Sequence, residues 1–205
     1  MIHYPIFDAT DGDVLDLVRE QRLLRLVTIG ADGSPAVGLH VYWHDGFTFE
    51  IHLVRQDPQL ADLRAGRPCL IEVDETLATI PHHWIDPGDV SHADQFYRCA
   101  SFTVDVDTTE DVAPLVEHLQ NLAARYADGP LTGIDVADEQ YAPYLRRLAL
   151  ARFTTRAVKS KFKLAQGARA ENVAAMIASL RARGEALDSK SADWAQAFLV
   201  RRNRA

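Results

Sequence analysis

Hydrophobic and polar residues alternate along several short runs of this chain, and that alternation predicts antiparallel strands. Over residues 47–54, aromatic and aliphatic side chains alternate with polar ones, which is the period of a strand with one buried face. The pairs Asp32-Gly33 and Asp45-Gly46 lie between neighbouring runs and are typical of hairpin turns, because glycine tolerates a positive φ. The other predicted strands are 23–29, 36–43, 67–74, 96–106 and 150–164.

Helical spacing predicts helices between and after these strands. Thr10 is followed three residues later by Asp13, a typical helix start, and Asp57 before Pro58 is another. The strongest periodicity runs over residues 112–126. Shorter helices are predicted around residues 141–148, 173–180 and 194–199. Residues 75–95 have no clear period and predict a long loop.

Five or six antiparallel strands with helices between them favour a small barrel over an open sheet, because closure removes exposed strand edges. The expected fold class is therefore mainly β or α+β, an antiparallel split β-barrel with inserted helices and a helical C-terminus. The run 150–164 has to supply the last barrel strand. We expect residues 1–167 to form the barrel domain and residues 168–205 a helical segment packed on it or on a dimer partner.

Composition indicates a soluble globular protein. Of the 205 residues, 47% are hydrophobic and 25% are charged, and no apolar run approaches the roughly 18 residues of a membrane span. The start of the chain lacks the basic and apolar regions of a secretory signal. Cys69 and Cys99 each lie in an apolar run, which indicates buried thiols rather than a disulfide. We expect a cytoplasmic protein.

The net charge of −7 conceals a strong asymmetry. Residues 1–145 contain 8 basic and 25 acidic residues (8 − 25 = −17), whereas residues 146–205 contain 14 and 4 (14 − 4 = +10). Either the two parts pack against each other, or the basic part holds a phosphate or a nucleic acid. The acidic total speaks against a dedicated DNA-binding module.

Two segments carry a family resemblance. Residues 52–59, HLVRQDPQ, and residues 161–166, KFKLAQ, with the helix ENVAAMIASLRARG after them, resemble the PaiB family of FMN-binding negative transcriptional regulators. The resemblance covers nearly the whole chain and implies a split barrel of the pyridoxamine-phosphate-oxidase-like type. It also implies a homodimer with FMN in a cleft between the subunits.

Carried over position by position, the resemblance implies FMN-binding residues but no catalytic ones. The long loop departs most from the family, with His83-Trp84-Ile85 where Ser-Trp-Tyr is common. The candidate cofactor-binding residues are His40, His52, Arg55, Trp84, Lys161, Lys163 and Gln166.

Sequence pattern alone allows two roles for the basic side chains among and near these candidates. Arg55 lies between a strand and a helix start, where free backbone N–H groups help to hold an anion, or it pairs with nearby acidic residues. Lys159, Lys161 and Lys163 alternate, so on a strand all three share a face. They form either a solvated edge or an anion site, and we expect one or two of them to meet phosphate.

The loop also concentrates potential metal ligands, but the spacing fits no standard zinc pattern, and we expect no metal there. It could supply the axial histidine of a haem. Three functions remain open: a regulator of the PaiB type that binds nucleic acid, a flavin-dependent oxidoreductase acting on a small molecule, and a diverged barrel without cofactor or with haem. The loop residues in question are His82, His83, Asp86, Asp89 and His92.

Overall fold

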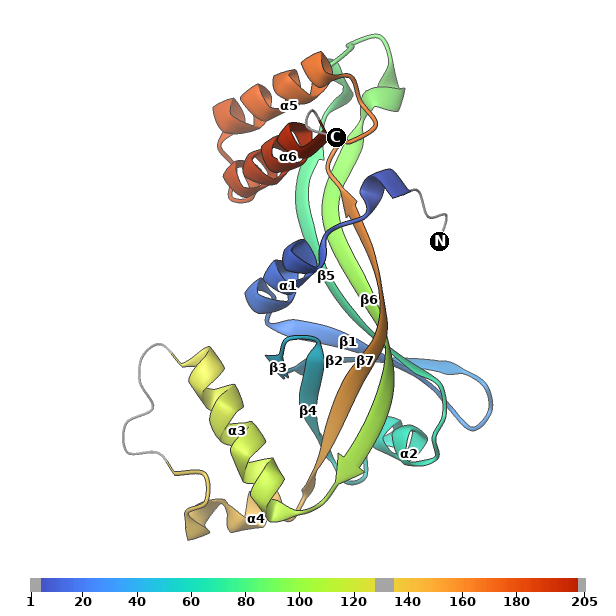
Figure 1. The fold of residues 1–205 in the computed structure, drawn as a ribbon, viewed down its shortest axis with the longest axis vertical. Coiled ribbons are helices and arrows are strands. Elements are labelled where there is room, and N and C mark those ends of the chain that lie inside the picture. Colours follow the sequence, from blue (N-terminus) through green and yellow to red (C-terminus); the bar gives the residue numbers. More distant parts are fainter. Residues whose placement is uncertain (1–4, 128–134, 203–205) are drawn as a thin grey trace. The chain divides into compact units, whose positions relative to one another are not determined.

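The computed structural model describes residues 5–127 and 135–202, and the chain divides into two compact units (Figure 1). The barrel unit comprises Arg19–Val73 and Ser101–Val158. The helical unit comprises the described parts of residues 1–18, 74–100 and 159–205. Three long strands contribute residues to both units. They are β5 (Cys69–Ile80), β6 (Asp94–Thr109) and β7 (Leu148–Lys163).

The described strands form one antiparallel sheet whose strand order is β2-β1-β5-β6-β7-β4-β3. This sheet and the helices around it confirm the expected fold class, a split β-barrel with inserted helices and a helical C-terminus. The predicted strand 23–29 is reproduced, and the turn at Gly33, with φ 83°, confirms the first hairpin. The shorter strands are β1 (Leu23–Ile29), β2 (Pro35–Val41), β3 (Trp43–Asp45) and β4 (Thr48–Val54).

Strand β7 joins the β3–β4 hairpin to the rest of the sheet. It pairs antiparallel with β4 from Thr48 opposite Thr154 to Val54 opposite Leu148. The first half of β7 therefore makes the connection that barrel formation needs. The KFK end, residues 161–163, belongs to the helical unit instead.

Helices α1 and α2 begin where the sequence indicated. The side chains of Thr10 and Asp13 exchange hydrogen bonds with each other's backbone N–H at the start of α1, at 3.0 and 3.2 Å. Asp57 accepts from the backbone N–H of Gln59 at 2.8 Å at the start of α2. The α-helices are α1 (Asp11–Glu20), α2 (Pro58–Arg64), α3 (Val112–Tyr126), α4 (Ala142–Leu145), α5 (Ala170–Arg183) and α6 (Asp188–Arg202). The described helices include none long and apolar enough to cross a membrane.

The loop predicted over residues 75–95 is shorter than expected. Strand β5 continues to Ile80 and β6 begins at Asp94, so the connection contains only the short 3-10 helices η2 (His82–Trp84) and η3 (Val90–His92). The strand was missed because Leu77 and Ala78 are consecutive and both buried, which breaks the alternation by which a strand is recognised.

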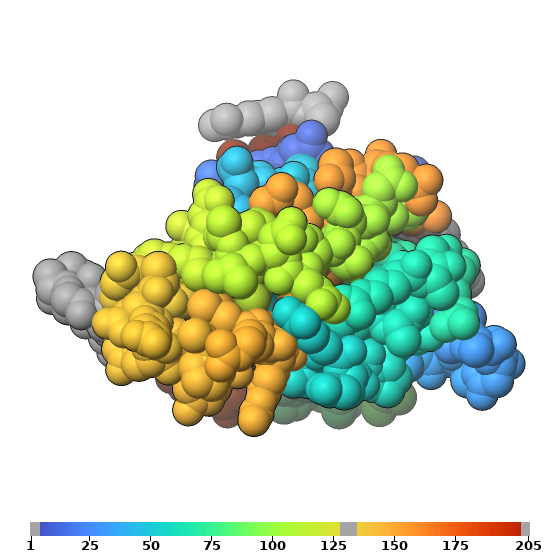
Figure 2. All heavy atoms as spheres, turned by 90° about the horizontal axis from the view of Figure 1, so that it is seen from below, coloured from blue at the N-terminus to red at the C-terminus, as the bar shows by residue number. Residues whose placement is uncertain are grey.

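Each unit has its own apolar core. In the barrel unit, Phe49 and Phe102 pack edge to face with ring centroids 4.8 Å apart. Leu115, Val136 and Leu145 form a second cluster, which packs the segment around α4 against α3. These two segments are next to each other in Figure 2. In the helical unit, Phe162 near the end of β7 packs against Trp194 and Phe198 of α6, and α5 packs against α6. The buried residues of the two helices include Val173, Ile177, Leu180 and Ala195.

Candidate functional site

A chain of buried polar side chains crosses the barrel unit beneath α3. Glu50 and His52 stand two residues apart on β4, so they share one face of the sheet. Arg152 and Leu150 lie opposite them on β7. Helix α3 packs against β3 and β4 and supplies His118, which is fully buried. The face of β4 that alternation marks as polar is therefore covered, and Glu50 is only 3% exposed.

Hydrogen bonds connect these side chains in a line. Arg152 donates from Nε to Glu50 Oε1 at 2.7 Å. The other oxygen, Oε2, lies 3.3 Å from Nδ1 of His118. Nε2 of His118 lies 3.2 Å from Nδ1 of His52. The Glu50 carboxylate and both nitrogens of His118 thus have partners, as buried polar groups require.

The surroundings of Glu50 and His52 shift the pKa values of these two side chains and so decide which of them is charged. Burial alone would raise the pKa of Glu50, but hydrogen bonds from His118 and Arg152 outweigh it and leave the pKa below its ordinary value. Burial lowers the pKa of His52 to about 4, and the positive charges that His118 and His40 can carry act in the same direction. Near neutral pH, Glu50 is therefore ionised and His52 is neutral.

His40 approaches His52 from strand β2 and has a fixed partner of its own. Its Nε2 lies 3.0 Å from Oε1 of Gln59, a residue of α2 that is 7% exposed. The Gln59 amide nitrogen donates to the carbonyl of Leu26 at 2.9 Å, which fixes the amide orientation. His40 must therefore donate from Nε2. Gly38 makes this contact possible, because a Cβ there would lie 2.1 Å from Gln59 Oε1 and 2.5 Å from His40 Nε2.

The structure thus brings together two of the predicted site residues, His40 and His52, with two that sequence reasoning missed, His118 and Glu50. A signal for His118 was available. It stands three residues after Leu115 and four before Leu122, on the buried face of α3. A titratable residue at a core position of an amphipathic helix needs a buried partner, and that requirement singles it out.

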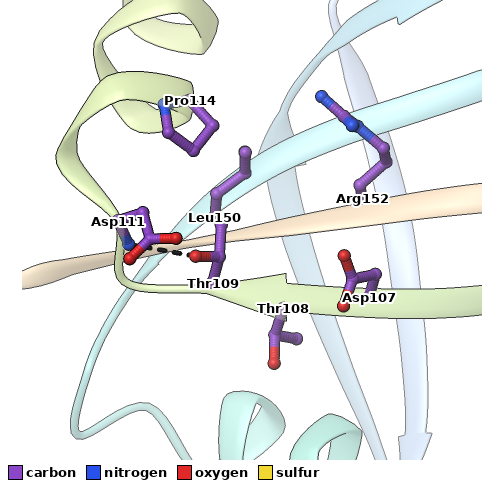
Figure 3. A pocket seen from close by; sticks show the side chains of 7 residues that line it. All are labelled: Asp107, Thr108, Thr109, Asp111, Pro114, Leu150 and Arg152. Carbon is purple, nitrogen blue, oxygen red and sulfur yellow. Dashed lines mark hydrogen bonds between the residues drawn. The ribbon is translucent and has the colours of Figure 1, made fainter.

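A pocket of about 360 Å³ adjoins this chain at Arg152 (Figure 3). The end of β6 supplies hydroxyl and carboxylate groups, and Thr109 accepts from the backbone N–H of Asp111 at 3.0 Å. Arg152, whose side chain is 51% exposed, is the one cation among the lining residues. The lining consists of Asp107, Thr108, Thr109, Asp111, Pro114, Leu150 and Arg152.

Arg55, the predicted anion contact, is engaged by the protein itself. Its Nε donates to the carbonyl of Leu148 at 3.1 Å, and its guanidinium lies 2.7 Å from Glu110. Arg64 pairs with the same carboxylate at 2.5 Å. These are the contacts of an arginine that neutralises nearby acidic residues. With a third of its side chain exposed, Arg55 still reaches solvent.

The lysines and the tryptophan carried over by resemblance lie in the helical unit. Lys163 pairs with Asp94, and the ammonium group of Lys161 lies 5.5 Å from the ring of Phe7. The guanidinium of Arg183 lies 4.9 Å from the ring of Trp84. Each side chain therefore has a contact within its own unit.

Gln166 closes the turn that follows β7. Its Oε1 accepts from the backbone N–H of Leu164 at 2.7 Å, and its Nε2 donates to the carbonyl of Phe162. Ala165 between them takes a left-handed φ of 63°. In this structure, Gln166 therefore holds the backbone. The predicted set divides between the units, with His40, His52 and Arg55 in the barrel unit and Trp84, Lys161, Lys163 and Gln166 in the helical unit.

The acidic residues of the loop hold its turns. Asp86 accepts from the backbone N–H of Gly88 at 2.8 Å, and Asp89 accepts from that of Ser91 at 2.9 Å. Within residues 5–127 and 135–202, no group of three His, Cys, Asp or Glu side chains is arranged to hold a metal ion.

The fold recurs in solved structures. No known family model and no curated protein sequence matches this chain. An FAD and haem binding protein from Mycobacterium smegmatis superposes with a TM-score of 0.63 at 18% identity, over 82% of this chain and 78% of that one. The flavocytochrome Anf3 from Azotobacter vinelandii gives 0.61 at 13% identity, over 77% and 68%. A conserved hypothetical protein from Mycobacterium tuberculosis gives 0.61 at 18% identity, over 79% and 90%. The fold is shared.

Proposed function

We propose that this protein binds FMN and functions as a split-barrel flavoprotein of the PaiB type. The observation that carries the proposal is that His40 and His52, assigned to FMN by resemblance, both lie in the barrel unit, close enough that positive charge on His40 lowers the pKa of His52. The shared fold with an FAD and haem binding protein and with a flavocytochrome supports a cofactor of this class. Bound FMN would supply redox chemistry that the protein's own side chains lack.

The donor set of the barrel unit fits a flavin in part. His52 Nε2 and His40 Nδ1 meet no hydrogen-bond partner among the described residues, and as unprotonated nitrogens they can accept from a ring N–H. Arg55 would exchange Glu110 for the phosphate. The residues of the helical unit fit less well, because Lys163 and Gln166 already bind protein groups.

Titration of the purified full-length protein with FMN, followed by flavin fluorescence and calorimetry, tests the proposal. We expect saturable binding with one FMN per chain. A protein that is colourless as purified and takes up no added FMN contradicts both flavin functions. Haem binding in its place, seen as a Soret band after reconstitution, would favour the haem alternative.

Arg55→Ala should weaken FMN binding by about tenfold or more, because a charge-assisted hydrogen bond contributes roughly 1.5–3 kcal/mol. The free energy of unfolding should change by less than about 1 kcal/mol, since the pair with Glu110 is solvent-exposed. Calorimetric titration and urea denaturation measure the two effects.

Arg64→Ala is the matched control, because Arg64 binds the same carboxylate but is not assigned to FMN. Its FMN affinity should stay close to that of the wild type. Equal losses in both variants would indicate a general charge effect and remove Arg55 from the site.

A homodimer completes the proposal, and the outer face of the β1–β2 pair supports it. β2 is an edge strand, yet Val37, Leu39 and Val41 are 63%, 60% and 41% exposed. Leu23, opposite Val41 on β1, is 46% exposed. An exposed apolar edge strand of this kind promotes association with another protein chain unless it is covered. A second copy of this chain is the occupant that the PaiB resemblance implies.

Leu39→Lys should convert the dimer to a monomer without unfolding it, because a charge at an apolar interface is costly whereas the same charge in solvent is not. Light scattering after size-exclusion chromatography measures the mass, and circular dichroism checks the fold. The control is Val90→Lys, at a site 74% exposed in the loop of the helical unit. A Leu39→Lys variant that stays dimeric would rule out this face as the interface.

A flavin-dependent oxidoreductase is the second candidate, favoured by the pocket beside Arg152 and the histidine chain next to it. NAD(P)H-dependent turnover by the FMN-loaded protein with an electron acceptor would support it. The regulatory role rests on the PaiB resemblance alone. Salt-sensitive, sequence-selective DNA binding would support that role.

A further inference from the structure

We infer that Glu50, His118 and His52 form a buried proton relay that makes Nε2 of His52 a general base. The ligand it serves is a ring N–H or hydroxyl group bound at the outer end of the chain. This deepens the proposed function, because such a base would act on a substrate or on the flavin ring. The relay itself is a property of the folded chain, so it can be tested without any flavin.

Each hydrogen bond of the relay has one possible direction when His118 is neutral. Ionised Glu50 has only acceptors, so His118 must donate to it from Nδ1. A neutral His118 then has a bare Nε2, which can only accept. His52 must therefore donate from Nδ1. Its own Nε2 is left unprotonated, and no described residue donates to it.

A proton that arrives at His52 need not stay there. When a ligand N–H or O–H transfers its proton to Nε2 of His52, the proton on Nδ1 of His52 can pass to Nε2 of His118. His118 then carries two N–H groups, one directed at Glu50 and one at His52. The ligand has lost one proton and the relay has gained one, so the charges balance, and the positive charge rests on His118.

The position of that charge decides whether His52 is a useful base. Burial holds the pKa of His52 at about 4, so His52 alone would be a weak base near neutral pH. Nδ1 of His118, by contrast, lies 3.3 Å from the Glu50 carboxylate, so a proton passed inward from His52 would place its positive charge beside a negative one. Moving the charge from His52 to His118 removes much of the cost of proton uptake.

The groups around the relay come from two other elements, β7 and β2, and set its limits. Arg152 on β7 binds the second oxygen of Glu50 and keeps that carboxylate ionised. His40 on β2 lies near His52 and, when protonated, opposes charge on it. Leu150 lies opposite His52 on β7 and contributes no charge. The described neighbours therefore favour a neutral His52, and they favour passing an incoming positive charge on to His118.

Nitrogen-15 NMR of the histidine-labelled full chain, recorded slightly above pH 7, tests the relay directly. We expect His52 to be protonated at Nδ1 and bare at Nε2, and His118 to be protonated at Nδ1. Glu50→Gln should reduce the Nδ1–H population of His52, although residue 50 does not touch that ring. His118→Phe should reduce it further. The control is His44→Asn on β3, which should leave His52 unchanged.

Lowering the pH then shows where the proton settles. The relay predicts the imidazolium signature on His118 before His52. A wild-type His52 protonated at Nε2, or a His52 that becomes charged first, would overturn the inference. So would a Glu50→Gln variant that keeps its fold, as seen from unchanged His44 signals, and an unchanged His52 tautomer. If the relay holds and FMN does not bind, the relay stands while the flavin function fails.

Discussion

Glu75→Gln should destabilise the protein by about 3–5 kcal/mol, the cost of removing one charge of a buried ion pair. Arg98 is fully buried and donates from Nε to Glu75 at 2.8 Å. The same carboxylate binds Lys190 of α6. The guanidinium also lies 4.4 Å from the ring of Trp194, so it has no route to solvent when the carboxylate is neutralised.

Urea denaturation followed by circular dichroism measures this loss. Glu72→Gln is a matched control on the same strand, since Glu72 pairs with Arg25 at 3.7 Å and both side chains are about a third exposed. That substitution should cost about 1 kcal/mol or less. Equal effects of the two substitutions would contradict the claim that burial makes the Glu75 pair important.

The double variant Glu75→Leu, Arg98→Met separates charge from packing. Replacing a buried ion pair by apolar residues of similar size is often neutral, so most of the lost stability should return. If the double variant is as unstable as Glu75→Gln, the cluster contributes through its shape and its contacts with Lys190 and Trp194 rather than through charge balance.

Gly38→Ala should cost about 1–3 kcal/mol from overpacking alone, because the added methyl would overlap Gln59 and His40. Gln59 can move only by giving up its bonds to His40 and Leu26. A buried amide that loses its partners adds about 1–3 kcal/mol. FMN binding should weaken as well, since His40 would leave its place near His52.

Thermal unfolding and FMN titration of the same samples measure both effects. Gly167→Ala is the control, because a Cβ there meets no atom within 4 Å. It should leave stability within about 0.5 kcal/mol of the wild type. A Gly38→Ala variant with full stability and an unchanged His40 signal would show that Gln59 has another way to satisfy its amide.

Local pattern was sufficient for most of the elements. The strand Leu23–Ile29 and the helix Val112–Tyr126 follow from periodicity, and the helix starts follow from caps at Thr10 and Asp57. The far end of β5 did not follow, because Leu77 and Ala78 interrupt its alternation. A rule based on period two fails wherever a strand changes the face that it buries.

The candidate site was likewise predicted only in part. Resemblance named His40 and His52, and positive charge on His40 lowers the pKa of His52. Glu50 was assigned to the polar face of its strand, where solvent is the default expectation, and His118 is 66 residues away from His52 in sequence. Nothing in either local sequence states that the two meet.

The sequence by itself determined most of the strands, the starts of α1 and α2 and the hairpin turns, because these depend on residues within a few positions of one another. Only the tertiary structure decided that α3 covers the polar face of β4 and that Glu75 neutralises Arg98. Those contacts join residues far apart in the chain, and burial then turns ordinary polar side chains into a connected, low-dielectric site.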